Sequence, residues 1–106
     1  MKESKGWREV DLELIAFLER YASSLIKWDI VMFFAQNPYT RDTSDNIALR
    51  LGRDRKAIAL ELYDLALLGF LEREVIDDTP VYRLTSDAIL RKLAWRMSQK
   101  YNALKA

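Results

Sequence analysis

Hydrophobic residues recur along the first third of this chain with the spacing of amphipathic helices. Between residues 8 and 25 the apolar side chains fall three and four positions apart, as they do along one face of a helix. This set comprises Val10, Leu14, Phe17, Leu18, Tyr21 and Leu25. The pattern repeats over residues 27–36 and stops at Pro38, because proline lacks an N–H group and disfavours helix in the residue before it. We therefore predict two consecutive helices here.

Two further helices are predicted between residues 43 and 68. Capping residues at 43–46 precede a short apolar segment that ends at Gly52. Asp54 is the expected N-cap of the next helix, and Gly69 suits the left-handed conformation that often follows a helix. The apolar face of that helix is Ile58, Leu62 and Leu65. The pattern predicts a short helix and a longer one, joined by a tight turn.

The last third of the chain predicts a β-hairpin followed by a long helix. Residues 70–76 and 81–84 read as strands, and residues 77–80 between them have turn composition. The final helix is expected to run to about residue 104, with Leu90, Ala94, Met97, Tyr101 and Leu104 along one face. Ser44 and Ser86 precede helices, so we interpret both as caps rather than nucleophiles. The predicted fold is mainly α with one hairpin.

Composition narrows the possible functions. The chain has 106 residues, of which 50% are hydrophobic and 31% charged, as in a single soluble globular domain. It has no cysteine and no histidine, which removes disulfides, thiolate nucleophiles and the commonest general base and zinc ligands. We therefore expect no metal, no cofactor and no enzymatic activity. Apolar runs are too short to cross a bilayer and no signal peptide is evident, so a cytoplasmic location is expected.

Four segments in order along the chain resemble parts of a winged helix-turn-helix domain. Residues 44–52 look like the first helix and turn of the motif, and residues 55–62 look like the start of its recognition helix. Residues 67–73 are similar to the LxxLGLIxR sequence that leads into the wing. Residues 82–85 are similar to the YxLT sequence that leaves it. The resemblance implies a winged-helix core over about residues 26–85.

This resemblance also implies a function. The long flanking helices, at about residues 8–25 and 86–104, are similar to those of small MarR-, ArsR- and PadR-like transcription regulators, where terminal helices usually build a homodimer. The chain is then expected to place a recognition helix of about residues 54–68 in the major groove of double-stranded DNA. Metal sensing in the ArsR-like group relies on Cys and His ligands, so that activity does not carry over.

Two sets of site residues follow from this reading. The basic residues of the motif, together with exposed positions of the recognition helix, are the expected DNA contacts. They are Arg41, Ser44, Arg50, Arg53, Arg55, Lys56, Ala59, Tyr63, Arg73 and Arg83. The apolar stripes of the terminal helices are longer than the core can cover, so they are the expected dimer interface. Its residues are Leu14, Phe17, Tyr21, Leu90, Met97, Tyr101 and Leu104. The alternative is that the two helices pack on each other as a helical hairpin within a monomer.

Charge keeps a second function open. The net charge is only +1, without the strongly basic signature of many nucleic-acid-binding domains. The hairpin tip is Asp77-Asp78, flanked by Glu72 and Glu74, and acidic groups repel a phosphate backbone. The outward face of the recognition helix is also largely apolar. The alternative is a winged-helix module that binds another protein and does not bind DNA.

Overall fold

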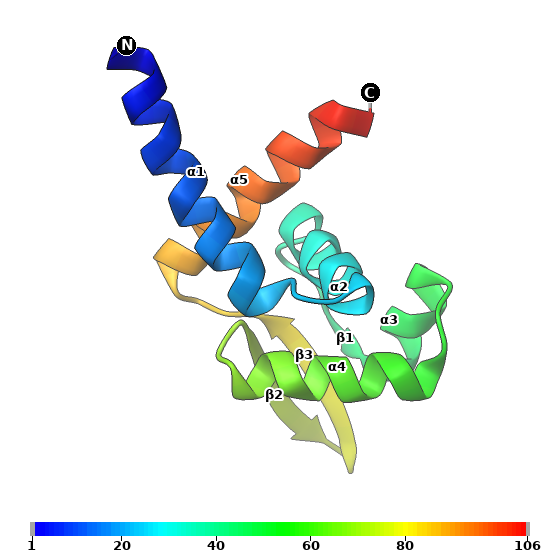
Figure 1. Ribbon diagram of the computed structural model, residues 1–106. Coiled ribbons are helices and arrows are strands. Elements are labelled where there is room, and N and C mark those ends of the chain that lie inside the picture. Colours follow the sequence, from blue (N-terminus) through cyan, green and yellow to red (C-terminus); the bar gives the residue numbers. More distant parts are fainter. Residues whose placement is uncertain (1, 106) are drawn as a thin grey trace.

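A computed structural model describes residues 2–105, and the side chains of residues 12–102 within them. Apart from one additional short strand, the helices and the hairpin follow the order that the sequence predicts (Figure 1). The elements are α1 (Lys2–Tyr21), α2 (Leu25–Gln36), β1 (Arg41–Thr43), α3 (Ser44–Leu51), α4 (Arg55–Leu67), β2 (Leu71–Ile76), β3 (Thr79–Leu84) and α5 (Ala88–Lys105). The mainly α fold with a hairpin is confirmed.

The first helix ends earlier than residue 25, where the sequence predicted its C-terminus. It stops at Tyr21, and Ser24 caps α2 by accepting a hydrogen bond from the Lys27 N–H over 3.1 Å. Leu25 is consequently the first residue of α2 and is exposed, so it does not continue the apolar stripe. The serine side chain supplies the capping oxygen that a new helix start needs, and this local bond separates two helices with similar spacing.

A core forms where α1, α2, α4 and α5 meet the base of the hairpin. Phe70, just before β2, is fully buried, with its ring centroid 5.9 Å from Phe17 and 5.6 Å from Tyr21 of α1. Ile30 and Phe34 of α2 are also fully buried. This packing anchors the hairpin to the first helix.

The sheet contains a strand that the sequence did not predict. Strand β1 pairs antiparallel with β3, giving the strand order β1-β3-β2. The hairpin itself turns on two residues, Asp77 and Asp78, whose φ angles of 50° and 63° are both positive. Such a turn matches the right-handed twist of the flanking strands, and aspartate tolerates the left-handed region. Strand β3 therefore begins at Thr79, earlier than predicted.

The helix caps differ by one residue from two of the predictions. Thr43, not Ser44, caps α3: its hydroxyl accepts a hydrogen bond from the Asn46 N–H over 3.2 Å. Asp87, not Ser86, accepts hydrogen bonds from the first N–H groups of α5, at 2.9 and 3.0 Å. Ser86 bonds instead to the Glu72 carboxylate.

Four of the predicted dimer residues contribute to the chain's own core. Leu14, Phe17, Tyr21 and Met97 are buried there, which leaves little of their side-chain surface for a second copy. Their stripes are covered where α1 and α5 pack on α2 and Phe70. Leu90 and Tyr101 are half-buried against the same core, and the Leu104 side chain lies outside the described residues. Beyond this contact, α1 and α5 diverge, and their outer turns lie on the side of the molecule away from the hairpin tip (Figure 1).

Candidate nucleic-acid interface

A tight turn joins α3 to α4. Gly52 adopts a φ of 65°, and the Arg53 N–H donates to the Ala48 carbonyl over 3.1 Å. Ala48 itself is fully buried, and its small side chain allows the two helices to approach closely. Asp54 then caps α4 by accepting a hydrogen bond from the Ala57 N–H over 3.0 Å. The helix-turn-helix predicted from the sequence is therefore present in the structure.

The outward surface of α4 is mostly apolar. Ile58, Leu62 and Leu65 face the core, which leaves Lys56, Leu60, Tyr63 and Leu67 on the opposite side. Leu60 is 67% exposed and Leu67 is 69% exposed. Of these four side chains only Lys56 is charged, and Ala59 is half-buried beside them. This face can contact thymine methyl groups but supplies few donors for guanine or adenine.

Acidic or aromatic neighbours hold the arginines at the start of the motif. The Arg53 Nε atom lies 2.6 Å from the Asp29 carboxylate, and an Arg55 Nη atom lies 3.5 Å from that of Asp45. The Arg50 guanidinium stacks over the Phe33 ring, 4.7 Å from its centroid. Within residues 12–102, Lys56 makes no ion pair. Lys56 is thus the cation of α4 that is available to an incoming phosphate without breaking a salt bridge.

The two faces of the hairpin carry different residues. Arg73 lies on the face toward α4, where its guanidinium is 5.3 Å from the Tyr63 ring centroid and its Nε donates to the Tyr82 hydroxyl over 3.1 Å. Arg83 lies on the opposite face, opposite Glu72 in the strand register, and its Nη2 atom is 2.8 Å from Glu72 Oε1. Arg73 therefore lies on the same side of the hairpin as α4, whereas Arg83 lies on the other side.

Arg41 of β1 joins this second face. It is opposite Arg83 in the register and pairs with Glu74 of β2, across β3. Glu72 accepts hydrogen bonds from the Ser86 N–H and from Arg83, and these bonds hold the pKa of its carboxyl below the ordinary value. The structure therefore splits the predicted DNA contacts into a set near α4 and a separate, internally paired set on the back of the sheet.

The sequence did not reveal this back face. Recognising β1 as a strand would have indicated this face. However, β1 has only three residues, which is too short to show the alternation of apolar and polar side chains by which a strand is recognised. Ser44, another predicted contact, is half-buried in the first turn of α3.

The arrangement of helix, helix, tight turn, helix and hairpin is the winged helix-turn-helix fold. Solved structures with this fold are similar to the chain over nearly its whole length. One is the homodimeric winged helix-turn-helix DNA-binding domain Mb0332 from Mycobacterium bovis, a possible ArsR-family transcriptional regulator. The two share 17% identity with a TM-score of 0.64, over 92% of this chain and 88% of that one.

Two other solved structures show comparable likeness. The transcriptional repressor BigR from Xylella fastidiosa has 17% identity and a TM-score of 0.63, over 95% of this chain and 96% of its own. The Staphylococcus aureus protein MepR, solved as a mutant bound to an oligodeoxyribonucleotide, has 15% identity and a TM-score of 0.59, over 95% of this chain and 76% of its own. No protein-family model and no curated protein matches the sequence. In the part of the chain that the structure describes, no helix is long and apolar enough to span a membrane.

Proposed function

We propose that this protein is a DNA-binding transcription regulator that places α4 in the major groove. The observation that carries the proposal is the α3–Gly52–α4 turn, which presents one side of α4 to solvent beside the hairpin. The similar structures include a DNA-binding domain and a protein bound to DNA. A helix held in this way can enter the major groove while its neighbour crosses the backbone.

Phosphate contacts would come from the start of α4 and the end of α3. Lys56 is free to bind a phosphate directly. Arg50, Arg53 and Arg55 are exposed enough to exchange a protein partner for a phosphate, although the two ion pairs must first open. Tyr63 and Ala59 would make apolar base contacts. The back-face residues Arg41 and Arg83 would remain in their salt bridges.

Binding to duplex DNA at several salt concentrations tests the proposal. Because phosphate contacts release counterions, the affinity of a random duplex should fall steeply between about 50 and 200 mM salt. A fluorescence-anisotropy titration measures this slope. If no duplex binds even at the lowest salt, α4 does not read DNA.

We also propose that the protein acts as a homodimer through surfaces other than the buried stripes. Leu12 and Ile15 are exposed on one side of α1, opposite its core face, and Trp95 is exposed on α5. The Glu13 and Arg96 side chains approach to 4.0 Å, so these segments of the two helices lie near one another. A second copy covering these side chains would remove apolar surface from water and place two copies of α4 at a fixed spacing.

A second candidate function is supported by the exposed side chains of α4. Leu60, Tyr63 and Leu67 form an apolar stripe, and the hairpin tip carries Asp77 and Asp78. This combination suits a protein partner with apolar anchors and basic flanks better than a phosphate backbone. Replacing Leu60 and Leu67 by serine separates the two functions. Those substitutions would leave the salt-dependent part of DNA binding intact, whereas they would abolish binding to a protein.

A further inference from the structure

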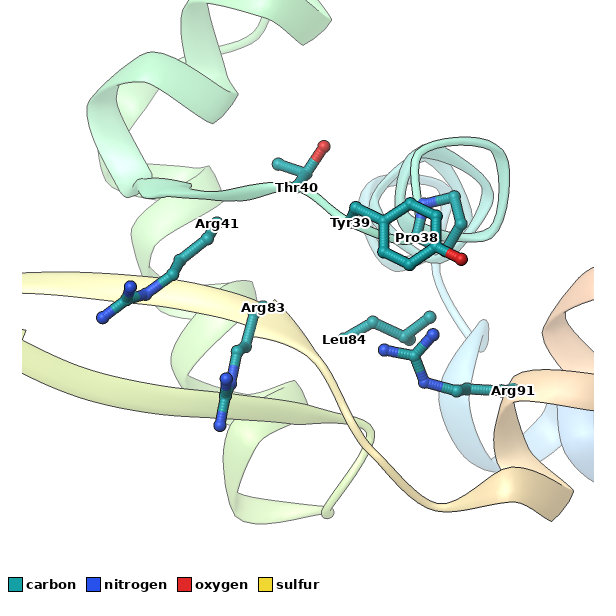
Figure 2. Close-up of a pocket in the computed structure, with 7 residues that line it drawn as sticks. All are labelled: Pro38, Tyr39, Thr40, Arg41, Arg83, Leu84 and Arg91. Atoms are coloured by element: carbon teal, nitrogen blue, oxygen red, sulfur yellow. The ribbon is translucent and has the colours of Figure 1, made fainter.

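A small cavity lies on the back of the sheet, away from the exposed side of α4. Its volume is about 170 Å³. It is bounded by the turn after α2, by β1 and β3, and by the first turns of α5 (Figure 2). The lining residues are Pro38, Tyr39, Thr40, Arg41, Arg83, Leu84 and Arg91. The proposed DNA interface uses none of the residues on the α5 side or the turn side of this cavity.

Arg91 differs from the other two arginines of the cavity. Arg41 and Arg83 each pair with a glutamate of β2, and in Figure 2 their side chains run away from Arg91. Arg91 is half-buried, and its Nε donates to the Thr85 carbonyl over 2.7 Å. Within residues 12–102 it has no carboxylate partner. Its side chain is thus fixed at Nε, while the positive charge of the guanidinium is not neutralised.

One side of the cavity beside the Arg91 guanidinium is apolar. The side chain points toward Leu84, beneath the Pro38–Tyr39 turn (Figure 2). Leu84 is buried, whereas Tyr39 is 91% exposed although it is a large aromatic residue. An exposed ring beside a partly desolvated cation offers a wall against which a small molecule can pack. The cavity therefore combines the guanidinium of Arg91 with an apolar wall, while its other two arginines are paired with glutamates of β2.

We propose that this cavity binds a small organic carboxylate. The carboxylate would accept hydrogen bonds from the Arg91 Nη atoms, since a planar guanidinium matches carboxylate geometry. The compact apolar body of the ligand would pack between Leu84, Pro38 and the Tyr39 ring. The size is sufficient, because an apolar cavity of about 150 Å³ holds a molecule as large as benzene. A bare inorganic anion would leave these apolar walls without a partner.

Nuclear magnetic resonance titration of the full chain tests the site without DNA. Butyrate should shift the signals of the Leu84 methyl groups, the Tyr39 ring and the Arg91 Nε–H, and should leave those of α4 unchanged. Butyramide has the same shape without the charge, and inorganic phosphate has charge without the apolar body. Both should bind at least about tenfold more weakly than butyrate. Equal binding of butyramide, or tighter binding of phosphate, would overturn the proposal.

Substitutions at neighbouring positions of α5 complete the test. Arg91→Gln should weaken butyrate binding by about tenfold or more, and Arg91→Lys should weaken it less, because lysine keeps the charge without the fork. Lys92→Gln removes the same charge from the exposed side of α5 and should leave binding unchanged. If Arg91→Gln binds butyrate as the parent chain does, Arg91 is not the anion donor. A chemical-shift spectrum of each variant in the absence of ligand establishes that it is folded.

Discussion

Lys27 on α2 and Asp64 on α4 form an ion pair in which the Nζ and Oδ2 atoms lie 2.5 Å apart. Glu61, one turn earlier on α4, lies 3.4 Å from the same Nζ atom. The hydrogen bond to Asp64, assisted by Glu61, raises the pKa of the Lys27 ammonium above its ordinary value. This pair joins the helix that bears the proposed DNA contacts to the core helix α2.

Removing this pair should destabilise the protein. Lys27→Met should lower the free energy of unfolding by about 1–2 kcal/mol, because two carboxylates lose their cation. Urea denaturation at neutral pH measures the loss, and Lys92→Met, on the exposed side of α5, is the matched control. The pKa of Lys27 is higher in the folded protein than in the unfolded chain. The ion pair therefore stabilises the fold fully at pH values below the unfolded pKa of Lys27, and this stabilisation is lost as the pH rises through the folded pKa. A difference between variant and parent that grew in strong alkali would contradict this assignment.

Because of Glu72, we expect the stability of the protein to depend on pH in the acid range. The hydrogen bond from the Ser86 N–H and the pairing with Arg83 lower the pKa of Glu72 in the folded protein. Its carboxylate therefore stabilises the fold at pH values above the unfolded pKa of Glu72, and this stabilisation is lost as the pH falls through the folded pKa. Glu72→Gln should therefore be less stable than the parent at neutral pH, and the difference should shrink on acidification. Thermal unfolding between neutral pH and about pH 3 measures it. Glu74→Gln, which keeps the Ser86 bond intact, should show a smaller dependence.

The start of α4 predicts the effect of removing charge on DNA binding. Arg55→Ala combined with Lys56→Ala should weaken binding to all duplexes and flatten the salt slope by about one unit per lost phosphate contact. Fluorescence anisotropy at several salt concentrations measures both effects. Lys92→Ala combined with Lys100→Ala changes the net charge equally on α5 and serves as the control. Unchanged affinity in the α4 variant would remove this helix from the DNA interface.

The hairpin tip predicts the opposite effect. Asp77→Asn combined with Asp78→Asn removes two negative charges, while asparagine still tolerates the positive φ angles of the turn. If the tip lies near a duplex, binding should strengthen at low salt, and the gain should fade as screening shortens to about 8 Å in physiological salt. The same titration as above detects it. An affinity that does not change at any salt concentration would place the tip away from DNA.

The exposed side of α1 predicts the result of disrupting the dimer. Leu12→Lys combined with Ile15→Lys should convert a dimer to a monomer in light scattering at micromolar concentration, without loss of helix content. Leu49→Lys, which places a lysine at an exposed leucine of α3 outside the proposed interface, is the control. A parent chain that already has the monomer mass would contradict the homodimer. Met97→Lys is unsuitable for this test, because Met97 is fully buried and a charge there would unfold the chain.

Local signals account for what the sequence predicted correctly. Gly52, Asp54 and Gly69 each act within a few residues of themselves, and the turn, the cap and the helix end were found where they indicated. Such local signals could not predict contacts between residues that are far apart in the sequence. The Arg53–Asp29 pair joins residues 24 positions apart, and nothing in the composition links them. The pairing with β3, not its own pattern, makes β1 a strand.

The terminal helices show a different limit. The helical spacing of the apolar residues identified the apolar stripe of α5 through Met97. This spacing could not indicate which surface covers the stripe. A stripe buried by α2 and a stripe buried by a second copy have the same spacing. The DNA contacts are limited in the same way: the sequence indicates exposed cations, whereas the carboxylates that hold Arg53 and Arg55 emerge only once the helices are placed.

The direct passage from β1 into α3 makes the hairpin and the helix-turn-helix mechanically continuous. Thr43 is the last residue of β1, where it is opposite Val81 of β3, and it is also the N-cap of α3. No flexible linker separates the strand from the helix. A displacement of the hairpin would therefore be passed through β3 and β1 to the start of α3, because Thr43 belongs to both elements.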